Sequence, residues 1–283
     1  MTDVDWADRS FAETAGASTA YTVSGAGPAL VMIHGVGLNA SVWEPQIRAF
    51  ESRYQAIAYD TLGHGASAPP RPAATLKDYL EQLLGLLDAL EIDRAVLMGH
   101  SMGSLIAARF AIDHADRVEA LVAANPVYRR PPAQLASSRA RIRALEARGS
   151  GAALPETLAR WFGDPVDSDS PAVRQVETWI RQADPVGYAR AYRVFSEADP
   201  WLDGRLQGLS APALFVTGEL DPNSSPAMAR TMAAETPLGC AVILEGQRHM
   251  MSYVSPALFN PVVSRFLDQA AAPPGRTACR GGA

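Results

Sequence analysis

Short apolar runs alternate with longer helical segments along most of this chain, and this alternation restricts the possible folds more than any other feature. The runs are rich in β-branched residues and flanked by Gly, Pro, Asp or Asn, as strands are. The segments between them repeat apolar residues every three or four positions, as amphipathic helices do. This order predicts a parallel sheet with helices on both faces. The expected strands are residues 21–24, 29–33, 55–59, 95–98, 118–123, 213–216 and 241–244, and the expected helices are residues 41–52, 75–90, 102–113, 225–235 and 255–269.

The alternation is interrupted over residues 127–198, where the sequence becomes helical and rich in Arg and Ala. This segment holds 11 Arg and 8 acidic residues, so it is locally basic within an acidic chain. Strand-like runs resume at Ala213. We therefore interpret the segment as a helical cap inserted into one α/β core made of residues 1–126 and 199–270. The tail, 271–283, has too little apolar surface to order itself, and we expect it to be disordered.

The composition argues against several classes of partner. The 283-residue chain has a net charge of −5, and Lys77 is its only lysine, so it lacks the lysine-rich surface that follows a nucleic-acid backbone. No window approaches the ~18 apolar residues that a membrane span needs, and the acidic N-terminal segment is unlike a signal peptide. The two cysteines, Cys240 and Cys279, cannot form a disulfide framework and suit a reducing compartment. We expect a cytoplasmic protein with no nucleic-acid or membrane partner, in which both cysteines are bystanders; the oligomeric state is left open.

The segment Val96–Phe110, VLMGHSMGSLIAARF, places a serine where a strand changes abruptly into a helix. Its centre, Gly99–Gly103, matches the pattern G-x-S-x-G, in which flanking glycines allow a tight turn that exposes the serine hydroxyl. The start of the following helix adds backbone N–H groups and a field that favours a developing negative charge. Ser101 is therefore the candidate nucleophile; the simpler interpretation is a loop serine.

A serine hydroxyl needs a base to remove its proton, and the sequence offers five histidines. His100 is adjacent to the serine, but neighbouring side chains on a tight turn diverge. His114 lies at a helix end beside acidic residues, which favours a surface role, and His34 and His64 lie in turns that we expect to shape the mouth of the sheet. His249, on the loop after the last expected strand, is the candidate base; the simpler interpretation is a surface histidine.

Asp221 is the candidate for the carboxylate that orients this base. It follows a strand in the segment ALFVTGELDPNSSP, and it gives the order Ser, Asp, His of the α/β-hydrolase arrangement. Glu219 is interpreted as structural, and the other place for an acid, after strand 118–123, is taken by Asn125, whose amide cannot stabilise an imidazolium by charge. Loops at the carboxyl ends of parallel strands meet at one edge, so we expect Ser101, Asp221 and His249 to converge. The simpler interpretation of Asp221 is a turn cap.

Acyl transfer also needs two hydrogen-bond donors directed at the oxyanion. One is expected to be the backbone N–H of Met102, immediately after the serine. The other is assigned to Val36 in the segment VMIHGVGLNASVW, where Gly35 and Gly37 let the chain turn close to the site. The simpler interpretation of this segment is a glycine turn.

Together, the segments HGVG, YDTLGHGAS, GHSMG, GELDP and RHM, in this order, resemble the α/β-hydrolase superfamily from about Tyr21 to Asp268. The resemblance implies an eight-stranded, mostly parallel sheet flanked by helices, with the helical cap inserted after the sixth strand. It also implies hydrolysis without a metal ion or an organic cofactor.

Within the superfamily, the segments SVWEPQIRAF, YDTLGHGAS, LLDALEIDRAVLMGHSMG and LPETLARWFGDP are most similar to 3-oxoadipate enol-lactonases and related small-molecule esterases. A serine at position 101 argues against haloalkane dehalogenases and epoxide hydrolases, which use Asp there. C–C hydrolases of ring-fission products share the triad and often an Arg–Trp pair in the cap, which Arg160 and Trp161 match. They usually carry Trp after the catalytic histidine, whereas this chain has Met250.

These features predict a serine hydrolase that cleaves a small, carbonyl-containing ester or lactone through an acyl-enzyme. Arg160 and other cap arginines have the geometry to hold a substrate carboxylate, although a chain with one lysine also places arginine on solvated faces. Trp161 fits a pocket wall and core packing equally well. The alternatives are a C–C bond hydrolase that uses the same residues and a non-catalytic ligand receptor on the same fold.

Overall fold

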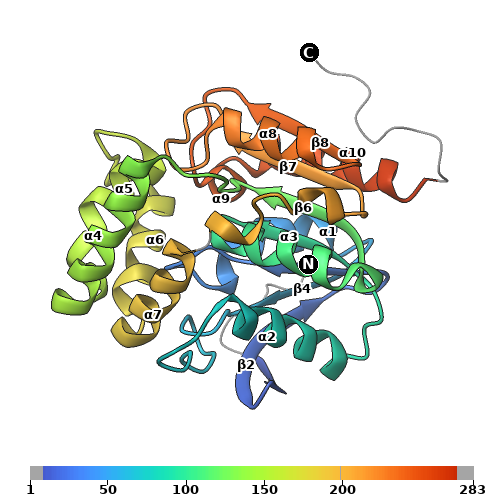
Figure 1. Ribbon diagram of the computed structural model, residues 1–283, viewed down its shortest axis with the longest axis horizontal. Coiled ribbons are helices and arrows are strands. Elements are labelled where there is room, and N and C mark those ends of the chain that lie inside the picture. Colours follow the sequence, from blue (N-terminus) through green and yellow to red (C-terminus); the bar gives the residue numbers. More distant parts are fainter. Residues whose placement is uncertain (1–8, 198, 273–283) are drawn as a thin grey trace.

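The computed structural model describes residues 9–197 and 199–272 (Figure 1). Its strands are β1 (Ser10–Thr14), β2 (Ala17–Ser24), β3 (Ala29–Ile33), β4 (Gln55–Tyr59), β5 (Ala95–His100), β6 (Val118–Ala124), β7 (Ala213–Gly218) and β8 (Gly239–Leu244). Its α-helices are α1 (Glu44–Phe50), α2 (Leu76–Ala89), α3 (Met102–Asp113), α4 (Pro132–Arg148), α5 (Leu154–Phe162), α6 (Pro171–Gln182), α7 (Pro185–Ser196), α8 (Pro226–Glu235), α9 (Met251–Val254) and α10 (Pro256–Ala270).

The strands form an eight-stranded sheet in the order β1-β2-β4-β3-β5-β6-β7-β8. Strand β2 pairs antiparallel with β1 and β4, and all the other neighbouring strands run parallel. The carboxyl ends of the parallel strands therefore share one edge, where the loops that follow them meet. The predicted fold class, a mostly parallel eight-stranded sheet, is confirmed.

Strand β1 has no counterpart among the strands expected from apolar runs. Its residues, SFAET, are mostly exposed, and it pairs with a single neighbour at the edge of the sheet. An edge strand needs no continuous apolar run because little of it is buried. By contrast, β3 and β4 have the bounds expected from the sequence, and all five residues of β3 are buried.

Helices cover both faces of the sheet (Figure 1). On one face α3 packs on β5 and β6, and α8 packs on β7 and β8. On the other face α1 packs with α9 and α10. Helix α2 begins with a capping box made by Thr75 and Asp78, and its apolar stripe is buried. None of the helices in the described ranges is long and apolar enough to span a membrane.

Helices α4 to α7 follow β6 and lie together at one end of the molecule, at the left of Figure 1. We call residues 127–198 the cap segment. Arg130, near its start, donates to the backbone carbonyls of Phe195 and Ser196 at 2.9 and 3.1 Å. This arginine therefore joins the two ends of the cap segment where the chain leaves and re-enters the sheet.

Cys240 in β8 is buried, as its apolar flanks indicate. The expectation that both cysteines are bystanders stays a prediction. Cys279 lies outside the described residues. The predicted tail, 271–283, also lies outside them apart from its first two residues.

Candidate active site

Ser101 lies at the turn between β5 and α3, in a strained backbone conformation. Its φ is +53° and its ψ is −113°, an unusual combination for a residue with a side chain. The turn is possible because the residues two positions before and after Ser101, Gly99 and Gly103, carry no side chain. A Cβ on Gly99 would lie 2.2 Å from the carbonyl oxygen of Gly103, and a Cβ on Gly103 would lie 2.1 Å from that of Ile33. The motif thus fixes both the turn and its packing against β3.

Asp221 and His249 come from the loops after β7 and β8, and their buried side chains meet. His249 Nδ1 lies 2.7 Å from Asp221 Oδ2. The other carboxylate oxygen, Oδ1, accepts the backbone N–H groups of Asn223 and Ser224 at 2.8 and 3.2 Å. The carboxylate is therefore held in one orientation, with one oxygen facing the imidazole.

The surroundings of Asp221 favour its charged form. Burial by itself raises the pKa of this carboxyl, but the charge and hydrogen bond of His249, the N–H of Asn223 and the amide of Asn125 outweigh burial. The pKa of Asp221 is lowered as a result. The side chain is thus an anion at neutral pH and can stabilise a protonated His249.

Asn125, the residue after β6, occupies the other position at which a catalytic acid could stand. It hydrogen-bonds to Asp221 instead. Its Nδ2 donates to Asp221 Oδ2 at 2.8 Å, and its backbone oxygen accepts the hydroxyl of Ser224 at 2.6 Å. Sequence reasoning considered Asn125 only as a missing charge. Glu219, the other rival for the acid, points elsewhere and accepts the backbone N–H of Gly246 at 2.9 Å.

His100 connects the serine turn to the loop that carries His249. Its Nε2 lies 2.9 Å from the backbone oxygen of His249, to which it donates. Burial, together with the charge of His249, lowers the pKa of His100 to about 3, so this histidine is neutral at physiological pH. His100 thus holds the backbone of the candidate base, a contact that the sequence did not indicate.

The loop after β3 presents Val36 to the same region. Gly37 N donates to His64 Nε2 at 2.9 Å, and Leu38 N donates to the carbonyl of Gly35 at 3.2 Å. Burial lowers the pKa of His64 to about 4, which leaves its Nε2 lone pair free to accept. Val36 N donates no hydrogen bond within the described part of the chain.

Met102 is the first residue of α3, and its N–H is one of the helix-start donors that have no acceptor within the helix. The two predicted oxyanion donors belong to segments that pack closely, the loop after β3 and the start of α3: a Cβ on Gly35 would lie 3.2 Å from the Cβ of Ser101.

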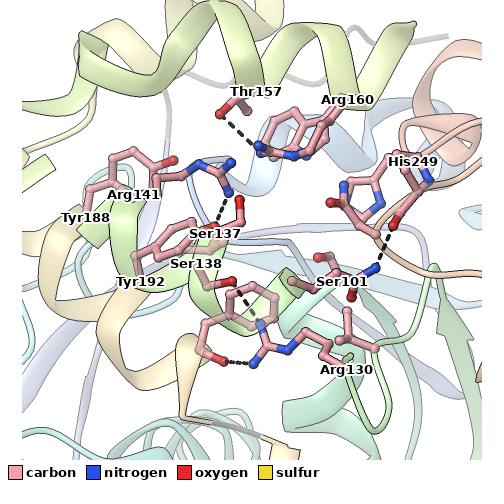
Figure 2. A pocket seen from close by; sticks show the side chains of 17 residues that line it. Ser101, Arg130, Ser137, Ser138, Arg141, Thr157, Arg160, Tyr188, Tyr192 and His249 are labelled. Carbon is pink, nitrogen blue, oxygen red and sulfur yellow. Dashed lines mark hydrogen bonds between the residues drawn. The ribbon is translucent and has the colours of Figure 1, made fainter. Parts of the chain in front are cut away.

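Ser101, His249 and Val36 line one cavity with a volume of about 110 Å³, and so do both residues of the predicted Arg–Trp pair (Figure 2). The Trp161 ring lies 5.6 Å from the His249 ring, with 30° between the planes. Trp161 is thus a pocket wall as well as a buried residue, and Arg160 faces the cavity rather than solvent alone. The cavity is enclosed by the sheet edge on one side and by the cap segment on the other.

Several residues of the cavity were not singled out from the sequence. They include Arg130, Arg141, Tyr188 and Tyr192, all from the cap segment. Arg141 lies in the run SRARIRAL, where Arg139 and Arg143 have the same local pattern but are exposed. Only the fold distinguishes the three arginines. Among the described residues, no group of His, Cys, Asp and Glu side chains has the arrangement of a metal site.

Known proteins are similar to this chain over most of its length. The chain matches the alpha/beta hydrolase fold family over residues 28–256. It is 35% identical over 254 residues to the (E)-2-((N-methylformamido)methylene)succinate hydrolase of Acinetobacter baylyi, covering 88% of this chain and 93% of that one. It is 30% identical over 243 residues to 3-oxoadipate enol-lactonase 2 of the same organism, covering 86% and 89%.

A solved structure gives the same result. The enol-lactonase of Burkholderia xenovorans LB400 superposes with a TM-score of 0.82 at 28% identity, over 92% of this chain and all of that one. The match extends over the sheet, the loops at its edge and the cap segment together. The chain therefore belongs to the α/β-hydrolase family.

Proposed function

We propose that this protein is a serine hydrolase that cleaves a small carboxylic ester or lactone through an acyl-enzyme. One observation carries the proposal: Ser101, at its strained turn, and His249, hydrogen-bonded to Asp221, line the same cavity. A strained backbone at a cavity, next to a buried imidazole–carboxylate pair, is the arrangement that nucleophilic catalysis by serine requires.

In the first half-reaction, His249 Nε2 accepts the proton of Ser101 Oγ while the oxygen attacks the substrate carbonyl carbon. The carbonyl π electrons move to oxygen, and the N–H groups of Val36 and Met102 bind this oxyanion. Asp221 keeps the other imidazole proton on Nδ1 and stabilises the imidazolium. Collapse of the intermediate breaks the C–O bond to the leaving group, which takes the proton from His249.

In the second half-reaction, water takes the place of the leaving group. His249 removes a proton from the water as its oxygen attacks the acyl carbon, and the same two N–H groups bind the second oxyanion. The bond between the acyl carbon and Ser101 Oγ breaks, and His249 returns the proton to the serine. For a lactone, the leaving oxygen stays attached to the acyl group, so one open-chain hydroxy acid is released.

The relatives support a hydrolase of small substrates and favour a second candidate. The Acinetobacter baylyi relative at 35% identity acts on a succinate that carries an N-methylformamidomethylene group. A substituted methylenesuccinate is therefore the second candidate substrate, for which Ser101, Asp221 and His249 would serve as the same catalytic set. The fold and cap are equally compatible with the lactone substrate of the other relative.

The decisive experiment combines active-site labelling with a single substitution. We expect a fluorophosphonate probe to label Ser101 and short p-nitrophenyl esters to be hydrolysed. In Ser101→Ala, labelling disappears and kcat falls on the order of 10⁴- to 10⁶-fold, while circular dichroism and Tm stay those of the parent. Unlabelled Ser101, or an alanine variant with its esterase activity intact, would overturn the proposal and favour a receptor.

A substrate panel separates the enzymatic candidates. It contains an enol-lactone acid, short esters, a substituted methylenesuccinate and a ring-fission dienoate. Turnover of the lactone and esters supports the main proposal, and turnover confined to the methylenesuccinate supports the second candidate. Turnover confined to the dienoate contradicts both and favours C–C bond hydrolysis.

A further inference from the structure

Three arginines line the cavity above Ser101: Arg130, Arg141 and Arg160. None of the Asp and Glu side chains that the structure describes lines it. Cationic groups that face an enclosed space lose hydration, and this cost is recovered when an anion binds there. The question is which of the three arginines are available to an anion.

Arg130 serves the fold. It donates to the carbonyls of Phe195 and Ser196, lies within 3.5 Å of the Ser138 hydroxyl, and its guanidinium stacks 4.7 Å from the centre of the Phe195 ring. Its donors are directed at the two ends of the cap segment. We therefore assign it a structural role.

Arg141 extends from α4 into the cavity (Figure 2). One of its terminal nitrogens donates to the hydroxyl of Tyr192, and its guanidinium lies 5.6 Å from the centre of that ring. Its Nε is buried and has no hydrogen-bond acceptor among the described residues, and no described carboxylate pairs with it. The aromatic ring thus positions a cation whose charge is not compensated.

Arg160 reaches the same cavity from α5 (Figure 2). Its one hydrogen bond to a described residue is a long one, 3.4 Å, to the hydroxyl of Thr157. Its Nε is also buried without an acceptor in the described chain. The next residue, Trp161, covers His249, so α5 places a cation beside the side chain that packs on the candidate base.

We propose that Arg141 and Arg160 form a subsite in the cap segment that binds a carboxylate group of the substrate. This inference rests on the proposed function and names its substrate class. Because Arg141, Arg160 and Ser101 line the same cavity, the carboxylate and the carbonyl that Ser101 attacks belong to one small substrate. The substrates are therefore half-esters or lactones of short dicarboxylic acids rather than neutral esters.

The kinetic test compares two p-nitrophenyl esters of similar acyl length, the hemisuccinate, which is an anion, and the butyrate, which is neutral. Hydrogen bonds to charged groups contribute enough that losing one arginine lowers kcat/KM for the hemisuccinate about 10- to 100-fold. We expect this loss in Arg141→Met and in Arg160→Met, with butyrate turnover changed less than about threefold. Arg143→Met, on the same helix but exposed, is the matched control and leaves both substrates unaffected.

Lysine variants show whether an activity loss in the methionine variants comes from unfolding or from the lost contact with the carboxylate. Arg141→Lys and Arg160→Lys keep the positive charge and remove the planar fork, so an intermediate loss on the hemisuccinate is expected. Equal losses on both esters in the methionine and lysine variants would overturn the subsite, as would a wild-type enzyme that prefers the butyrate.

A binding measurement separates the subsite from the chemistry. Calorimetry on Ser101→Ala should show that monomethyl succinate binds at least tenfold more tightly than methyl butyrate, and that Arg141→Met or Arg160→Met in this background abolishes the difference. If Ser101 is not labelled but this difference persists, the proposed function fails and the subsite stands. If labelling succeeds and the two esters bind equally, the subsite fails and the proposed function stands.

Discussion

The two walls of the cavity are built in different ways. On the sheet side, the charged carboxylate is paired: Asp221 accepts two backbone N–H groups, the imidazole of His249 and the amide of Asn125. His100 holds the loop of His249 from behind, and the buried atoms without a partner in the described chain, His100 Nδ1 and Asn125 Oδ1, belong to neutral side chains. On the cap side, Arg141 and Arg160 each keep a buried nitrogen without an acceptor in the described chain.

This difference has a physical meaning. A charged group whose hydrogen-bond partners are already in place is held in one orientation, and such a group needs little reorganisation during a reaction. Buried cations without a compensating charge have an unfavourable desolvation free energy that an anionic ligand offsets. They therefore favour anionic ligands over neutral ones. We infer that the sheet side serves the reaction common to many substrates and that the cap side selects among them. The predictions below test this division.

Asp221→Asn removes the charge on the sheet side while keeping the shape of the side chain. We expect kcat/KM to fall about 10⁴-fold on anionic and neutral esters alike, because the amide no longer stabilises the imidazolium or selects its tautomer. Steady-state kinetics with both esters measures the effect. Glu219→Gln, two residues away and bonded to Gly246, is the control and should retain activity. A loss of less than tenfold in Asp221→Asn would remove Asp221 from the proposed mechanism.

Gly37→Ala tests the contact between the sheet side of the cavity, at the loop after β3, and the cap side, at α7. Gly37 has a φ of +82°, and a Cβ there would lie 2.8 Å from the hydroxyl of Tyr188 in α7. The resulting shift moves the adjacent Val36 N–H, and losing one oxyanion donor costs roughly 10²-fold in kcat. We expect a loss of this size on both esters, measured as kcat under saturating substrate.

Gly16→Ala is the matched control for backbone strain. Gly16 also has a positive φ, +78°, but a Cβ there meets no atom within 4 Å. We expect this variant to lose about 1 kcal/mol of stability and no activity. Equal activity losses in the two alanine variants would show that strain in general, rather than the contact with the cap segment, is responsible.

The buried histidines of the sheet side predict a stability that depends on pH. His64 has its pKa lowered by burial to about 4, below the usual 6.5 of an unfolded chain. Between these values the unfolded state binds a proton that the folded state does not, so stability falls as the pH is lowered from about 6.5 to about 4. One such group contributes a slope of up to about 1.4 kcal/mol per pH unit.

His64→Gln should reduce this slope by about one proton's contribution, because the replacement does not titrate. Urea unfolding at several pH values between 4.5 and 7 measures the free energy of unfolding for both proteins. The remaining slope is assigned to His34 and His100, whose pKa values burial also lowers. A variant as sensitive to acid as the parent would show that His64 is protonated in the folded state.

The sequence predicted the sheet side better than the cap side, for a physical reason. A strand followed by G-x-S-x-G constrains the backbone itself, so local residues carry the information for the turn at Ser101. The cap cavity depends on how separate helices pack, and nothing in the run that contains Arg139, Arg141 and Arg143 distinguishes the arginine that faces inward. Strand β1 was missed because an exposed edge leaves no apolar signature.

Asn125 has a consequence for how such a site changes during evolution. The loops after β6 and β7 deliver their side chains to the same point, since Asn125 Nδ2 lies 2.8 Å from Asp221 Oδ2. A single-base change in its codon would turn this amide into a carboxylate at the second position, before the first acid is lost. Two carboxylates at this distance share one proton, so the pair keeps a single negative charge that either strand can supply, without any rearrangement of the sheet.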